Sequence, residues 1–207
     1  MGPGADTGAE GNWRFYPPLE LPPILQVALA QIVEHGYDAT SVRTIAREVG
    51  VTVPALYYHF ENKQAMLVAL LDHSMGIVSR HVAAALHEAG DDPSARLGAM
   101  VEAIVLYTVH HSDLAFLDSE RRALTEENRR RYVAHRDSVE GELHRIIEDG
   151  RARGVFRTPI PQECGRAILS MCQGIAGWYS PGGPLSPEET AARYVRLALA
   201  MVQSAGH

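Results

Sequence analysis

The chain has 207 residues, a net charge of −6 and 46% hydrophobic residues, a balance that fits a folded protein of one large or two small domains. The negative charge argues against a general nucleic-acid-binding protein, because such proteins present a broad basic surface to phosphates. The N-terminus contains glycines and charges but no apolar run, so we expect no signal peptide, no membrane span and a cytoplasmic location.

Residues 1–20 are rich in glycine, alanine and charge and show no periodicity, which predicts a disordered arm. Only the run Trp13-Arg14-Phe15-Tyr16 interrupts this composition. Arg14 could enter a DNA minor groove, as homeodomain arms do, but a loosely packed or disordered tail is the favoured interpretation.

Three short helices are predicted between Pro22 and Phe60. Pro22-Pro23 opens the first helix, which stops at Gly36. Ser41 is an N-cap for the second helix, and Gly50 ends it because glycine tolerates the left-handed backbone of a tight turn. A helix, a glycine turn and a second helix are typical of a helix-turn-helix, but also of a hairpin inside an ordinary helical bundle.

The third helix has Thr52 as its cap and Pro54 in its first turn, where the missing N–H costs nothing. Leu56 and Phe60 point toward a core. The outward positions offer hydroxyl, methyl and imidazole groups to phosphates and base edges. They are Thr52, Val53, Ala55, Tyr57, Tyr58 and His59. The pattern predicts a recognition helix for a DNA major groove.

The run Leu56–Phe60 followed by Asn62-Lys63, together with Gly36-Tyr37 and Gly50-Val51, closely resembles the TetR family of bacterial transcriptional regulators. The resemblance covers about residues 24–71 and implies a three-helix DNA-binding domain, which we place at residues 21–67, and double-stranded operator DNA as partner. Lys63 is the single lysine beside 18 arginines, and its counterpart in the family contacts DNA phosphate. The expected DNA-binding residues are Ser41, Arg43, Thr44, Thr52, Val53, Pro54, Ala55, Tyr57, Tyr58, His59 and Lys63.

A long helix is predicted from Asn62, its expected cap, to Gly90, and its roughly 40 Å would join the DNA-binding domain to a separate core. Residues 68–207 are the expected effector-binding and dimerisation domain. Further helices are predicted after Asp92-Pro93, over 113–124, after Thr125, over 162–179 and after the capping box that begins at Ser186. The fold class is therefore all-α, with about nine helices.

The final two helices are narrow and rich in small residues, and the resemblance implies that they pair across a two-fold axis. A homodimer would match a palindromic operator. Packing within one chain is the alternative. The expected interface residues are Gly165, Ile168, Cys172, Ile175, Tyr194, Val195, Ala198, Met201 and Val202.

The resemblance also implies a small-molecule pocket among the middle helices, whose occupation separates the two DNA-binding domains and releases a repressor. Candidate lining residues are Tyr107, His110, His111, Leu114, Phe116, Met171, Gln173 and Trp178. Residues of these types at helical spacing are more often core residues. Adjacent histidines diverge by about 100° on a helix, so we predict no metal site at His110-His111, and no cofactor.

The run Phe116–Leu124, with Gly154-Val155-Phe156 and Trp178-Tyr179, is more weakly similar to TetR-type regulators of fatty-acid and steroid catabolism, which respond to acyl-CoA thioesters. This similarity implies Arg121 and Arg122 as partners of CoA phosphates. Salt bridges from these arginines to Glu126 or Glu127 are the alternative. No catalytic motif is found, but a helical enzyme and a DNA-binding dimer without an effector stay open as other functions.

Overall fold

The structure, a computed structural model, describes residues 12–203, and within that range it consists of helices without β-strands. The nine α-helices are α1 (Pro23–His35), α2 (Val42–Val49), α3 (Val53–His59), α4 (Lys63–Ala89), α5 (Pro93–His110), α6 (Ser112–Phe116), α7 (Glu126–Ala152), α8 (Pro161–Gly174) and α9 (Pro187–Gln203). Two 3₁₀ helices, η1 (Leu117–Ala123) and η2 (Ile175–Gly177), follow α6 and α8. The all-α prediction with about nine helices is confirmed.

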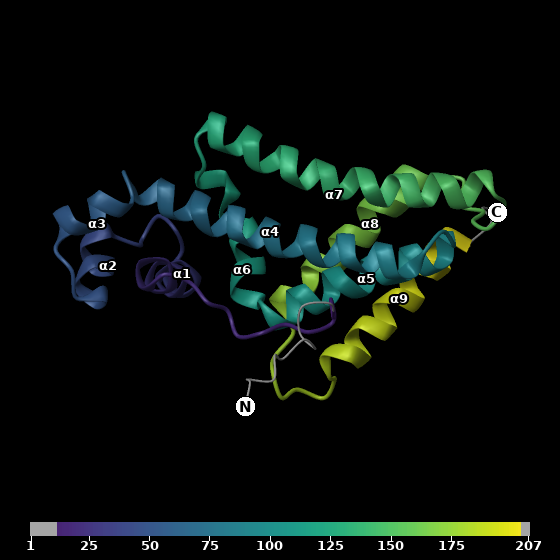
Figure 1. Ribbon diagram of the computed structural model, residues 1–207, viewed down its shortest axis with the longest axis horizontal. Coiled ribbons are helices and arrows are strands. Elements are labelled where there is room, and N and C mark those ends of the chain that lie inside the picture. Colours follow the sequence, from purple (N-terminus) through teal and green to yellow (C-terminus); the bar gives the residue numbers. More distant parts are fainter. Residues whose placement is uncertain (1–11, 204–207) are drawn as a thin grey trace, which may run out of the picture.

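The molecule is elongated, and its two ends differ in construction (Figure 1). Helices α1, α2 and α3 form a small head at one end, while α4 leaves the head and runs along the rest of the molecule, the body, with α5 to α9. Helix α5 is the centre of the body, because it packs against both α4 and α9 and is buried continuously from Ala103 to Val109. The long α4 therefore connects head and body, as its length predicts.

Capping residues begin the helices where the sequence predicts. The side chains of Ser41, Thr52 and Asn62 each accept a hydrogen bond from the backbone N–H three residues later. Ser186 and Glu189 form the complete reciprocal box, with the Glu189 carboxylate accepting from Ser186 N at 3.0 Å and Ser186 Oγ accepting from Glu189 N at 3.1 Å. These local bonds set the helix starts independently of tertiary packing.

Two predicted helices are shorter than expected. The segment 113–124 divides into α6 and the tighter η1, and the segment 162–179 leaves α-helical geometry after Gly174. Gly174 and Gly177 flank this change, and glycine is about 1 kcal/mol less favourable than alanine in a helix interior. Trp178 and Tyr179 consequently lie in a non-helical connection.

The N-terminal segment 12–20 packs on the body, so the disordered arm predicted for residues 1–20 does not extend over it; residues 1–11 lie outside the described residues. Trp13 is only 4% exposed, and its indole N–H donates to Glu88 at 2.7 Å. Arg14 forms ion pairs with Glu88 at 2.8 Å and Glu102 at 2.6 Å, and so lies on the body. Tyr16 donates to the Ala103 carbonyl at 3.0 Å. We call residues 12–20 the N-terminal strap.

Candidate functional site

Helix α3 presents an exposed polar and aromatic face to solvent. Its inner side is fixed by Leu56, which is fully buried, whereas Tyr58 is 88% exposed and Tyr57 is 47% exposed. The exposed members of the predicted set on and before α3 are Thr52, Pro54, Ala55, Tyr57, Tyr58 and His59, and Val53 is half-buried. A tyrosine that packs on almost nothing contributes little to folding, so this face is available for a partner.

Helix α2 supports α3 through a turn that only glycine adopts easily. Gly50 has φ 79° and ψ 28°, and its N–H bonds the carbonyls that end α2. At the other end of α2, Ser41 Oγ lies 2.8 Å from Thr44 Oγ1. Arg43 is exposed, so the first turn of α2 offers one cation and two hydroxyls beside α3. This is the helix-turn-helix arrangement that the sequence predicts.

Lys63 lies differently from the predicted phosphate contact. Its ammonium donates to the backbone carbonyls of Tyr37 at 2.7 Å, Thr40 at 2.9 Å and Asp38 at 3.4 Å, and it sits 4.1 Å from the centre of the Tyr37 ring. A lysine has three N–H donors, so these carbonyls use all of them. The single lysine therefore fastens the α1–α2 connection to the first turn of α4, and a phosphate contact stays a prediction.

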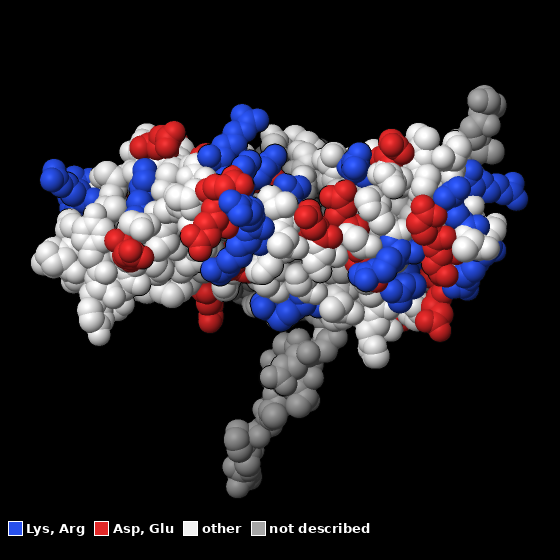
Figure 2. All heavy atoms as spheres, turned by 90° about the horizontal axis from the view of Figure 1, so that it is seen from above, with Lys and Arg blue, Asp and Glu red and all other residues white. Residues whose placement is uncertain are grey.

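Charges of both signs are interspersed on the molecular face of Figure 2. The spheres of Arg and Lys alternate with those of Asp and Glu over the middle and right of the view, and the head, at the left, shows both signs. Binding to DNA would therefore depend on a few placed groups rather than on a basic field, in agreement with the net charge of −6.

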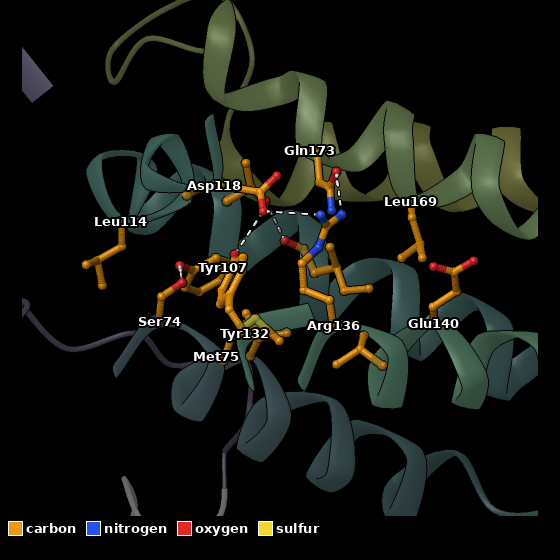
Figure 3. A pocket seen from close by; sticks show the side chains of 15 residues that line it. Ser74, Met75, Tyr107, Leu114, Asp118, Tyr132, Arg136, Glu140, Leu169 and Gln173 are labelled. Carbon is orange, nitrogen blue, oxygen red and sulfur yellow. Dashed lines mark hydrogen bonds and ion pairs between the residues drawn. The ribbon is translucent and has the colours of Figure 1, made fainter. Parts of the chain in front are cut away.

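The body contains a cavity of about 90 Å³ between α4, α5, the α6–η1 segment, α7 and α8. Its wall is mostly apolar and its upper end in Figure 3 is polar. The lining residues are Ser74, Met75, Val78, Ile104, Tyr107, Thr108, Leu114, Ala115, Asp118, Tyr132, Arg136, Val139, Glu140, Leu169 and Gln173. An apolar cavity with a few converging polar groups is the usual construction of a small-molecule site.

Asp118 organises the polar end of the cavity (Figure 3). One carboxylate oxygen accepts from Arg121 at 2.8 Å, and the other accepts from the Tyr132 hydroxyl at 2.8 Å and lies 3.4 Å from Arg136. Burial and the Asp118 charge raise the pKa of Tyr132, so the phenol keeps its proton and donates it. On the opposite wall Ser74 Oγ and the Tyr107 hydroxyl are 2.5 Å apart, and burial raises the pKa of Tyr107.

The structure brings only part of the predicted ligand set together. Tyr107, Leu114 and Gln173 line the cavity, whereas Phe116 and Arg121 line a shallower pocket beside it. Arg122, Met171 and Trp178 do not line the cavity. Arg121 pairs with Asp118 rather than with Glu126 or Glu127, and Glu126 pairs with Arg129 and Arg130.

The sequence did not predict Asp118, Tyr132, Arg136 and Glu140 as lining residues, and these include all the charged groups of the cavity lining. Tyr132, Arg136, Val139 and Glu140 follow helical spacing on α7, which is the signal that could have found them. This signal is weak, because α7 carries so many arginines and acids that one inward arginine does not stand out.

His110 and His111 lie beneath the N-terminal strap instead of in the cavity. The Tyr16 ring stacks on His81 at 4.1 Å and on His110 at 5.1 Å between centroids. Burial, and then the nearby His110, His81 and His73, lower the pKa of His111 to about 4, so it is neutral at pH 7. Within residues 12–203 no cluster of three or more His, Cys, Asp or Glu side chains could hold a metal ion.

Most of the predicted dimer residues are used inside the chain. Gly165, Ile168, Cys172, Ile175, Ala198 and Val202 are buried in the single chain, and Tyr194, Val195 and Met201 are half-buried. A Cβ at Gly165 would lie 2.6 Å from the His144 ring, so this glycine permits the close approach of α7 and α8. The apolar residues expected at the dimer interface are those that face the core of the same chain, because an amphipathic helix packs its apolar side against its own core.

The free sides of the last two helices carry other residues. They are Arg166, Ser170 and Gly174 on α8, Trp178 after η2, and Arg193, Leu197 and Ala200 on α9. Trp178 is 51% exposed and stacks on Tyr194, and Leu197 is 52% exposed. Such exposed large apolar side chains near small ones suit a helix-to-helix contact between two copies. Separately, none of the helices in the described range is long and apolar enough to span a membrane.

Comparison with known proteins agrees with this geometry. Residues 24–70 match the family model of bacterial regulatory proteins of the tetR family, and residues 90–202 match the tetracyclin repressor-like C-terminal domain. The transcriptional repressor KstR2 of Rhodococcus jostii is 31% identical over 186 residues, which cover 85% of this chain and 87% of that protein.

Two solved structures share the fold over almost their whole length. The regulator PfmR of Thermus thermophilus is 32% identical with a TM-score of 0.79, covering 87% of this chain and 99% of that one. AibR, solved in complex with isovaleryl coenzyme A and operator DNA, is 26% identical with a TM-score of 0.77, covering 84% of this chain and 95% of that one. With both of its domains matched, the chain belongs to the TetR family of bacterial transcriptional regulators.

Proposed function

We propose that this regulator is a repressor that leaves a palindromic operator when a CoA thioester binds in the body. The observation that carries the proposal is the largely apolar cavity, with its polar end at Asp118 and Arg136, in a chain whose relatives include a repressor and a regulator solved with an acyl-CoA and its operator. The apolar wall suits an acyl group, which the cavity would remove from water.

The DNA contacts of the proposal come from the head. Tyr57, Tyr58 and His59 would reach the major groove, while Ser41 and Arg43 would reach the flanking phosphates. The exposure of α3, against the burial of Leu56 behind it, supports this assignment. Because the head has few free cations, placement of these side chains would decide affinity.

The active form would be a homodimer joined by the free sides of α8 and α9. Leu197 and Trp178 would lose their exposure there, and Gly174 and Ala200 would let the helices approach closely. Two heads held at a fixed spacing would then read the two halves of a palindrome.

Gln64 offers a physical connection between the cavity and the head. Its side-chain oxygen accepts from Thr125 N at 3.0 Å and Asn128 Nδ2 at 2.6 Å, and its amide donates to the Ala123 carbonyl at 3.2 Å. These residues join η1, which carries Asp118, to α7, which carries Arg136. A ligand that separates η1 from α7 would thereby displace the first turn of α4, where Lys63 holds the head.

A catalytic role does not form part of the proposal, and the family consists of transcriptional regulators. The Ser74 hydroxyl pairs with Tyr107, whose raised pKa keeps the phenol protonated, so no phenolate is available there to take the serine proton, which supports a binding rather than a catalytic role for the cavity. We place the protein in the cytoplasm, where the operator would be. A helical enzyme and an effector-free dimer are the competing functions.

The test combines DNA binding with ligand challenge. DNA fragments selected by the protein are labelled, and fluorescence anisotropy follows their release by a panel of CoA thioesters, while thermal unfolding follows ligand binding. We expect at least one thioester to raise the Tm and release the DNA. Release by antibiotics but by no thioester would overturn the proposal that the effector is a CoA thioester. Failure to select any DNA would overturn the proposal that the protein represses from an operator.

A further inference from the structure

Arg136 is the arginine that lines the cavity, and it has few close partners among the described residues. Its guanidinium makes one hydrogen bond among the described residues, at 3.5 Å to Gln173 Oε1, and one ion pair, at 3.4 Å to Asp118. A guanidinium has five N–H donors, and good charged hydrogen bonds are about 2.7–2.9 Å long. The side chain points from α7 into the polar end of the cavity (Figure 3).

Arg121 is paired with the same carboxylate more closely than Arg136 is. It donates to both the Asp118 carboxylate and the Asp118 carbonyl at 2.8 Å. It lines the outer pocket and not the cavity. The carboxylate is therefore already engaged by Arg121 and by Tyr132, and Arg136 is a more distant third partner.

The two carboxylates of the cavity wall each have another cation as a partner. Glu140, the other acid of the cavity wall, has Arg166 at 3.8 Å. Asp118 has Arg121 as its closest arginine partner, and Arg121 and Arg166 both lie outside the cavity lining, so Arg136 is the cavity arginine without a close carboxylate of its own. Entry of one negative group beside Arg136 would give this guanidinium a close partner, whereas entry of a neutral group would remove water from Arg136, whose side chain is 29% exposed, without replacing its hydrogen bonds.

We propose that Arg136 receives a carboxylate at the acyl end of the effector, so that the effector is the CoA thioester of a dicarboxylic acid. This proposal rests on the proposed function and narrows its ligand class. The Arg136 fork would bind the carboxylate in a bidentate manner, and Gln173 would donate through its amide nitrogen. The cavity holds about 90 Å³, close to three water molecules, so the acyl group has a short carbon chain that ends in the carboxylate.

Matched thioester pairs test the charge directly. Glutaryl-CoA is compared with valeryl-CoA and succinyl-CoA with butyryl-CoA, by calorimetry on the full chain at fixed salt. We expect the dicarboxylic member to bind about tenfold more tightly or better, because hydrogen bonds between charged groups are among the stronger ones. Equal or tighter binding of the neutral member would overturn the proposal, while the thioester function would stand.

Variants assign the preference to one side chain. In Arg136→Gln the dicarboxylic and the neutral thioesters should bind with about equal affinity. Arg136→Lys should keep only part of the preference, because lysine has the charge but not the planar guanidinium that binds both carboxylate oxygens. Arg130→Gln, the matched control, removes an exposed arginine of the same helix that pairs with Glu126 and does not line the cavity, and it should keep the preference. A preference that survives in Arg136→Gln, or that disappears in Arg130→Gln, would contradict the assignment.

Two further ligands separate the sources of negative charge. Free glutarate and CoA without an acyl group are titrated in parallel, and both should bind at least tenfold more weakly than glutaryl-CoA. Binding of glutarate as tight as that of glutaryl-CoA would keep the carboxylate receptor but overturn the thioester effector. Equal binding by CoA alone would assign the recognition to phosphates and overturn the role of Arg136.

Discussion

The head and the body differ in where their functional groups lie. In the head the candidate DNA-binding side chains stand on a rigid frame and point outward, so that Tyr58 is 88% exposed while Leu56 behind it is buried. In the body the candidate ligand-binding groups face inward and bind one another, as Asp118, Tyr132 and Arg136 do. The head can therefore change its specificity without a change of fold, whereas the body couples ligand choice to its own packing.

Replacement of Tyr58 by alanine should show the separation of function from stability most clearly. We expect operator affinity to fall about 10- to 100-fold, since a specific contact contributes roughly 1–3 kcal/mol, while the free energy of unfolding changes by less than about 0.5 kcal/mol. Anisotropy and urea unfolding measure the two effects. Tyr58→Phe keeps the ring and isolates the hydroxyl, and a large loss of stability in Tyr58→Ala would refute the outward placement.

Lys63 is a predicted DNA-binding residue whose side chain, unlike that of Tyr58, also holds the fold together. Lys63→Met removes the donor of three backbone carbonyls, so we expect a loss of about 2 kcal/mol of stability in addition to weaker operator binding. Arg47→Met, which removes an exposed cation of α2, serves as the control and should leave stability nearly unchanged. If Lys63→Met has the same free energy of unfolding in urea as the wild type, the side chain has no structural role and its predicted function is phosphate binding alone.

His111 should make the body sensitive to acid in a way that the head is not. Its pKa is about 4 in the folded chain and about 6.5 when unfolded, so the unfolded chain binds more protons between these values. Stability is therefore complete above pH 6.5 and falls as the pH drops toward 4, by about 3 kcal/mol. His111→Gln should flatten this part of the profile, and exposed His87→Gln should not. A profile identical to the wild type in His111→Gln would assign the acid sensitivity to other groups.

The sequence predicts the head well because its signals are local. Ser41, Thr52 and Asn62 each bond a backbone amide three residues away, and these contacts form without the rest of the fold. The cavity depends instead on contacts between distant segments. Arg136 is one of 18 arginines, and nothing in its neighbours along the chain distinguishes it from those on the surface.

The residues of the dimer interface are a second feature that the sequence alone does not predict. An apolar stripe on a helix indicates that something covers it, but it does not say whether the cover is the same chain or a second copy. Ile168 and Ala198 follow the expected stripe and are buried within their own chain, whereas Leu197, next to Ala198 on α9, is 52% exposed. A rotation of about 100° per residue separates the two faces, and only the packing of the whole body decides between them.

The tryptophan in the strap and the one after η2 are intrinsic fluorescent probes of two different parts of the chain. The two tryptophans of the chain occupy opposite environments, with Trp13 in the strap 4% exposed and Trp178 beyond α8 51% exposed. In the single chain, emission from Trp13 should be shielded from aqueous quenchers while that from Trp178 is open to them, so iodide distinguishes the two; in the proposed homodimer Trp178 would be covered as well. With Trp178 replaced by phenylalanine, intrinsic fluorescence would record a single event, the attachment and release of the chain's N-terminal segment, without any added label.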